Sequence, residues 1–172
     1  VYYIGKLNRH FMDGTFAEGI TMVRKVEQYL NKNRNSIDLH HRMLFYYKIA
    51  CMYFGNGEYK KSMEYLQKVI SIRDPLVRRD LQCYARILNL IASYEAGIDY
   101  NLDYQIKAVY TFLVKMNDMH EVQREMIAFL KRLNTIYNAD FKHELNLLYE
   151  RLLPYTEHPY ERRTFFYLDV IS

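Results

Sequence analysis

The residues best suited to chemistry are six histidines and two cysteines, and their spacing fits no familiar catalytic or metal-binding motif. Asp38, His40 and His41 could supply metal ligands, but a residue such as Asp38 before an apolar helical stretch more often opens the helix. Neither Cys51 nor Cys83 has a neighbouring histidine and acid that would activate a thiolate. We therefore predict that the chain is not an enzyme and uses no metal or cofactor.

The run from Asp99 to Asp103 has the oxygen-bearing side chains that begin a calcium-binding loop. However, Tyr104 stands where such a loop needs Gly for its sharp turn, and no closing Glu follows. Asn101 or Asp103 fits the N-cap of a helix better.

Four arginines gather around one break in the pattern: Arg73, Arg78, Arg79 and Arg86. A phosphate or acidic-peptide contact is one interpretation, and solvated charges over helix ends are the other. The net charge of +4 is small and dispersed, so we do not expect nucleic acid to be a partner of this fragment.

Composition favours a helical protein. Half of the chain is apolar, with only 6 Gly and 3 Pro, while Tyr reaches 18. Both cysteines lie in apolar helical stretches and are interpreted as core thiols of a reducing compartment. No apolar run approaches the roughly 20 residues of a membrane span, so we expect a cytoplasmic protein.

Glycine turns divide the chain at intervals of about 40 residues, at Gly14, at Gly57 and at Gly97. Such a period indicates a helical-repeat array, with softer polar breaks splitting each period into two helices. About nine helices are predicted, at 1–12, 15–32, 38–55, 58–72, 76–96, 102–117, 119–137, 140–153 and 158–172. No linker separates domains, so residues 1–172 are predicted to form one array.

Two of these helices carry particular expectations. The stretch from Leu102 to Met116 is apolar on more than one side, which predicts a helix covered by neighbours all round. The range 158–172 is expected to cap the apolar face of 140–153. Because both chain ends read like the middle of a helix, we interpret the sequence as the C-terminal fragment of a longer protein.

The segment from Tyr46 to Tyr59 resembles a tetratricopeptide repeat. The first-helix signature of that family falls on Tyr46, Ile49, Ala50 and Tyr53. Ser62 and Leu66 match the small and large positions of the second helix, and small residues let two helices cross closely. The resemblance implies an all-α fold, namely a right-handed superhelical stack of antiparallel helix pairs, or α-solenoid.

The second half, from Asp80 to Arg163, also resembles the C-terminal part of an uncharacterised family of bacterial helical-repeat proteins. This resemblance implies further repeats upstream and a final helix running past Ser172. It carries no known activity.

In tetratricopeptide-like repeats, the partner-binding groove is lined by first-helix residues that lie between the packing positions. In one repeat these would be Leu44, Tyr47, Lys48, Cys51 and Phe54. In the next they would be Leu88, Asn89, Ala92 and Glu95, with a possible shift of one residue. Lys48 and Asn89 supply one basic and one amide residue of the family's peptide-carboxylate clamp, but the remaining residues favour an apolar or aromatic peptide. Tyr47 and Phe54 are candidate anchors, and simple packing against a neighbouring helix is an equal alternative.

We therefore expect a non-catalytic scaffold that binds a protein or peptide on the concave face of a helical-repeat stack. The alternative is the sensor or regulatory module of a transcription regulator whose DNA-binding part lies outside this fragment.

Overall fold

The computed structural model describes residues 2–74, 77–98, 102–116, 121–132 and 141–158. All regular structure in these ranges is helical, and none of it is a strand, as the sequence predicts. The chain divides into two compact units, residues 1–100 and residues from 101 onward, and each unit is described by itself.

The first unit contains α1 (Tyr2–Met12), α2 (Phe16–Thr21), α3 (Val23–Lys32), α4 (Leu39–Gly55), α5 (Tyr59–Ile70) and α6 (Arg79–Glu95). The second contains α7 (Leu102–Met116), α8 (Glu121–Arg132), α9 (Phe141–Leu152) and a short 3₁₀ turn, η2 (Leu153–Tyr155).

These helices follow the predicted ranges closely, with one difference at 15–32. That range is interrupted at Met22, whose N–H bonds to the carbonyl of Gly19 three residues back. Counting α2 and α3 as one interrupted helix, the described residues hold eight helices rather than about nine. The expected ninth helix, 158–172, lies outside the described residues except for His158.

Three helices of the first unit, α1, α4 and α6, end in the same turn. The glycines after them, Gly14, Gly57 and Gly97, all have positive φ angles, of 66°, 75° and 68°. Each glycine N–H bonds to the carbonyl three residues back, that of Phe11, Phe54 or Tyr94. The following N–H bonds to the carbonyl five residues back, that of His10, Tyr53 or Ser93. This double bond pattern is the Schellman motif, which favours Gly because the left-handed conformation strains other residues.

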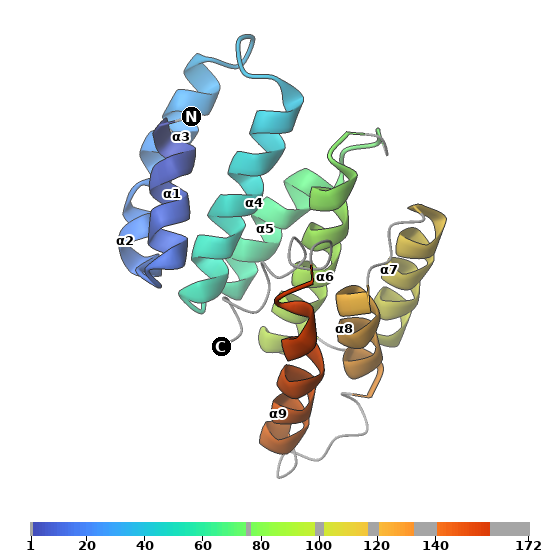
Figure 1. The fold of residues 1–172 in the computed structure, drawn as a ribbon. Coiled ribbons are helices and arrows are strands. Elements are labelled where there is room, and N and C mark those ends of the chain that lie inside the picture. The colour runs from blue at the N-terminus through green and yellow to red at the C-terminus, as the bar shows by residue number, and fades with distance from the viewer. Residues whose placement is uncertain (1, 75–76, 99–101, 117–120, 133–140, 159–172) are drawn as a thin grey trace. The chain divides into compact units, whose positions relative to one another are not determined.

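Helix α4 forms the centre of the first unit (Figure 1). It contacts α1 and α6 on its flanks and also packs against α2 and α5. Every residue from Tyr47 to Phe54 is buried, so α4 is a core helix on all sides.

Small residues bring the helices around α4 close together. The Ser62 hydroxyl of α5 donates a 2.9 Å hydrogen bond to the Ala50 carbonyl of α4, and both residues are fully buried. The close crossing expected at Ala50 and Ser62 is therefore present. Gly55 likewise lets the Phe16 ring of α2 approach α4 closely, because a Cβ at Gly55 would lie 2.5 Å from that ring.

In the second unit, α8 contacts both α7 and α9. Helix α7 buries Ile106, Val109 and Leu113 but leaves Tyr104, Tyr110 and Val114 exposed. The prediction that neighbours cover this helix all round is therefore wrong. Of the face that 158–172 was expected to cap, Leu148 and Leu152 are buried.

Candidate interaction surface

The two rings expected to anchor a ligand are buried in the structure. Tyr47 is 1% exposed and its ring lies 6.4 Å from that of Tyr84 on α6. Phe54 is 6% exposed and packs edge-on against Tyr59 of α5, with centroids 5.3 Å apart. Because buried rings offer a peptide no surface, both residues pack against neighbouring helices, which was the alternative interpretation. The proposal that they anchor a ligand therefore fails.

Lys48 and Cys51 are also buried on α4. The Lys48 ammonium lies 5.1 Å from the centre of the Phe11 ring on α1, a cation–π contact. Burial lowers the pKa of Lys48 and raises the pKa of the Cys51 thiol to about 11. The thiol is therefore protonated near neutral pH, which argues against a role as a nucleophile.

The predicted groove residues of α6 are displaced by one position. The equivalent turns at Gly57 and Gly97 show that residues of α6 correspond to residues of α4 with an offset of 40 positions, whereas the prediction used 41. Asn89 accepts a 3.3 Å hydrogen bond from Gln67 of α5, and Glu95 interacts with Tyr59 of the same helix. Both side chains therefore face α5, and no clamp forms between Asn89 and Lys48.

With the corrected offset, the positions equivalent to Leu44, Tyr47, Lys48, Cys51 and Phe54 are Tyr84, Ile87, Leu88, Ile91 and Tyr94. Four of these equivalent residues are buried, namely Tyr84, Ile87, Leu88 and Ile91. Counting backward from the glycine of each turn gives this alignment, because the Schellman motif fixes where the helix ends. Of all the predicted groove residues, Leu44 and Asn89 are half-buried and Glu95 is exposed.

Two of the four clustered arginines, Arg78 and Arg86, make hydrogen bonds within the first unit. Arg78 has a left-handed φ of 46° and binds the Asp80 carboxylate through two hydrogen bonds of 3.0 and 2.7 Å. Arg86 donates to the carbonyls of Gln82 and Ile70, at 3.0 and 3.4 Å. These internal partners weaken the interpretation of the cluster as a phosphate site.

Asp38 acts as the N-cap of α4. Its carboxylate accepts a 2.9 Å hydrogen bond from the backbone N–H of His41 and lies 2.8 Å from the His41 ring. These bonds hold the pKa of Asp38 below its usual value. Across the part of the chain that the structure describes, no three His, Cys, Asp or Glu side chains are grouped so that they could hold a metal ion.

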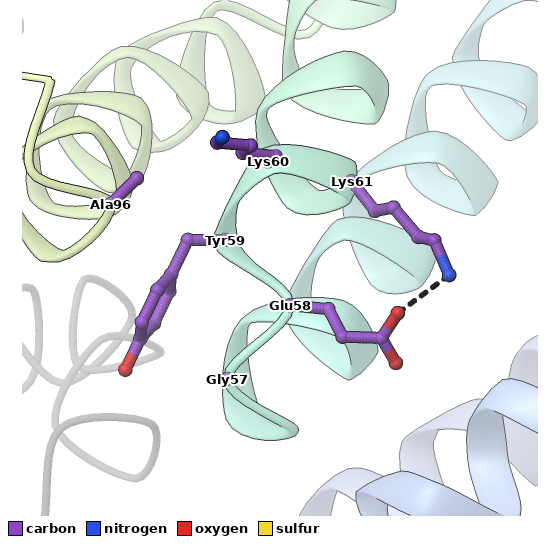
Figure 2. Close-up of a pocket in the computed structure, with 6 residues that line it drawn as sticks. All are labelled: Gly57, Glu58, Tyr59, Lys60, Lys61 and Ala96. Atoms are coloured by element: carbon purple, nitrogen blue, oxygen red, sulfur yellow. Dashed lines mark hydrogen bonds and ion pairs between the residues drawn. The ribbon is translucent and has the colours of Figure 1, made fainter.

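A shallow hollow of about 350 Å³ lies between the first turn of α5 and the end of α6. Figure 2 shows the Lys60 side chain extending toward α6, where Ala96 lies, and Glu58 paired with Lys61 away from it. The Glu58–Lys61 distance is 2.6 Å, and this pairing lowers the pKa of Glu58. The hollow presents the Lys60 ammonium group, which could bind an anion.

A second hollow, of about 410 Å³, lies beside α7 and α8 and is called the α7–α8 hollow below. It is lined by Asp103, Ile106, Lys107, Tyr110 and Lys131. The Lys131 ammonium of α8 lies 4.5 Å from the centre of the Tyr110 ring, which joins the two helices across the hollow. The hollow thus combines an apolar floor with a rim that carries two lysines and one aspartate.

Among the described helices, none combines the length and apolarity that crossing a bilayer requires. Comparison with protein-family models, with curated proteins and with solved structures gave no match to this chain.

Proposed function

We propose that this chain is a non-catalytic module of tetratricopeptide-like helical repeats that binds a protein or peptide partner. The observation that carries the proposal is the recurrence of one helix end at Gly14, Gly57 and Gly97, with intervals of 43 and 40 residues. Helical-repeat arrays recur at intervals in this range, and their common use is to present an extended surface to a partner.

The packing of α4 supports the same proposal. The pair α4–α5 crosses at Ala50 and Ser62 as the tetratricopeptide resemblance implies, and α5 packs in turn against α6. The first helices of successive repeats, α1, α4 and α6, contact one another in sequence, through Lys48 on Phe11 and Tyr47 on Tyr84. This succession of neighbours is what a superhelical stack requires.

We also propose a cytoplasmic location for the module. The two buried cysteines, Cys51 and Cys83, form no disulfide, and this supports a reducing compartment.

Site-specific photo-crosslinking tests the function. A photoreactive amino acid is introduced singly at Leu44 on α4, at Val114 on α7 and at Gln28 on α3, and the full chain is expressed in its native cells. A binding module should give a crosslinked adduct with the same partner at one or two of these positions and none at the others. Adducts at no position, or equal adducts at all three, would contradict a defined binding surface.

A further inference from the structure

Exposed apolar side chains concentrate on α7. The structure exposes seven large apolar side chains among the residues it describes, and three of them lie on this helix. Tyr104 is 75% exposed, Tyr110 42% and Val114 52%. Apolar residues scattered singly over a surface are ordinary, whereas neighbouring ones, such as Tyr110 and Val114 four residues apart on one helix face, are candidates for an interaction surface.

One stripe of α7 borders the α7–α8 hollow. Asp103, Lys107, Tyr110 and Val114 follow one another at steps of four, three and four residues, which places them along a single helix face. Three of these four residues line the hollow, together with Ile106 and with Lys131 from α8. The stripe and the hollow thus form one continuous surface.

The hollow pairs an apolar interior with a rim of two lysines and one aspartate, so its formal charge is positive. Ile106 is only 2% exposed and supplies a hydrophobic lining, while Tyr110 supplies an aromatic wall. Lys107 and Lys131 are exposed at the rim, and the cation–π contact with Tyr110 restrains the Lys131 side chain. A volume of about 410 Å³ lies at the lower end of the range of roughly 300–1,000 Å³ that ligand pockets occupy.

We propose that the α7–α8 hollow binds an acidic amphipathic peptide segment of a partner protein. A large apolar side chain of the segment enters the hollow against Ile106 and Tyr110, and a neighbouring Glu or Asp pairs with Lys107 and Lys131. This inference rests on the proposed function, because it names the partner chemistry of one surface of the module.

Charge favours a peptide over a nucleic acid or an anionic membrane. Residues 101–172 contain 9 Lys and Arg and 10 Asp and Glu. A polyanion needs an extended basic surface, whereas a single carboxylate needs only the two lysines at this rim.

Fluorescence titration of the full chain tests the inference. The probe is a labelled helical peptide with Leu and Phe on one face and Glu on the other. The comparison ligands are the same peptide with Lys in place of Glu, phosphatidylserine vesicles and a single-stranded oligonucleotide. The variants are Lys107→Met and Lys131→Met, which keep the apolar stem of each lysine, and Tyr110→Ala. Lys115→Met, an exposed lysine of α7 that does not line the hollow, is the matched control.

The Glu peptide should bind saturably, and the Lys peptide should bind at least about tenfold more weakly. Lys107→Met, Lys131→Met and Tyr110→Ala should each weaken binding about fivefold or more, and Lys115→Met should change it by less than about twofold. Any of four results would overturn the site: equal binding of the two peptides, no saturable binding, binding of vesicles or oligonucleotide alone, or wild-type affinity in Lys131→Met.

The crosslinking experiment separates this site from the proposed function. Crosslinking at Leu44 but not at Val114 would overturn this site while supporting the proposed function. The absence of adducts at every position would contradict the proposed function itself.

Discussion

The two units of the chain use their apolar residues differently. In the first, α4 is buried from Tyr47 to Phe54, and three glycine turns fix where α1, α4 and α6 end. In the second, α7 buries one face against α8 but exposes Tyr110 and Val114 on another. A helix that is apolar on several sides is thus a core element in one unit and carries an exposed apolar surface in the other.

Charge divides along the same boundary. Residues 1–100 contain 15 Lys and Arg and 10 Asp and Glu, whereas residues 101–172 contain 9 and 10. The net positive charge of the chain therefore comes from the first unit, and the concentration of exposed apolar side chains on one helix belongs to the second. The contrast teaches that net basic charge and exposed apolar side chains can lie in different units, so overall charge is a poor guide to the surface that a partner would use.

The largest effect is expected from removing a side chain from the buried core of the first unit. Leu66 of α5 is fully buried, and Leu66→Ala should lower the free energy of unfolding by about 3 kcal/mol through lost burial and a new cavity. The control, Leu153→Ala, shortens a side chain in the second unit that is 47% exposed, and it should change stability by less than about 1 kcal/mol. Chemical denaturation of both variants measures the difference. Equal losses would remove the contrast between a packed and an exposed apolar residue.

Helix positions and the close crossing could be predicted from the sequence because both depend on local features. Gly14, Gly57 and Gly97 satisfy a backbone conformation that few other residues tolerate, so they locate helix ends without tertiary information. Ala50 and Ser62 are small residues at the spacing that the tetratricopeptide resemblance implies, and they do lie in contact.

Which apolar faces are covered could not be predicted, because burial depends on neighbours that a helical period does not identify. Tyr47 and Tyr110 both lie on apolar helices, yet Tyr47 is buried against Tyr84 whereas Tyr110 is exposed. The alignment of α6 with α4 was wrong by one residue, and such an error rotates a position by about 100° around a helix of 3.6 residues per turn. That rotation turns Asn89 toward Gln67.

A smaller loss of stability is expected at high pH, and it should arise from the buried face of α4. Burial raises the pKa of Cys51 to about 11, so the unfolded chain releases this proton at lower pH than the folded chain. The contribution of the protonated Cys51 thiol to the free energy of unfolding is therefore full below about pH 8.5. This contribution, about 2–3 kcal/mol, is lost as the pH rises toward 11.

Denaturation at pH 8 and at pH 10.5 measures this dependence on pH. Cys51→Ala should reduce the loss, because it removes the titrating thiol. The raised pKa of Tyr47 adds a further loss above about pH 10, so some slope should remain in the variant. An identical slope in wild type and Cys51→Ala would contradict the burial of this thiol.

The next effect concerns the contact between α2 and α4. A Cβ at Gly55 would lie 2.5–2.6 Å from three atoms of the Phe16 ring, so Gly55→Ala should destabilise the first unit by about 2 kcal/mol through overpacking. Gly5→Ala is the control, because a Cβ there meets nothing within 4 Å. It should be neutral or stabilising, since Ala favours the helix. Thermal unfolding of both variants decides the matter, and a stabilised Gly55→Ala would show that Phe16 does not pack closely against α4.

The smallest effects test whether the three helix ends of the first unit are equivalent. A Cβ at Gly14, Gly57 or Gly97 has open space around it, so crowding plays no part at any of them. All three nevertheless have φ between 66° and 75°, where a side chain strains the backbone. Replacing each with Ala should therefore cost about 1 kcal/mol at every position. Denaturant titration of the three single variants, with Gly5→Ala beside them, gives the comparison. Three similar losses would support one repeated structural unit, because equivalent turns respond equally to the same change. If only Gly57→Ala lost stability, the three helix ends would not be equivalent despite their common hydrogen-bond pattern. That result would remove the main support for a repeat array.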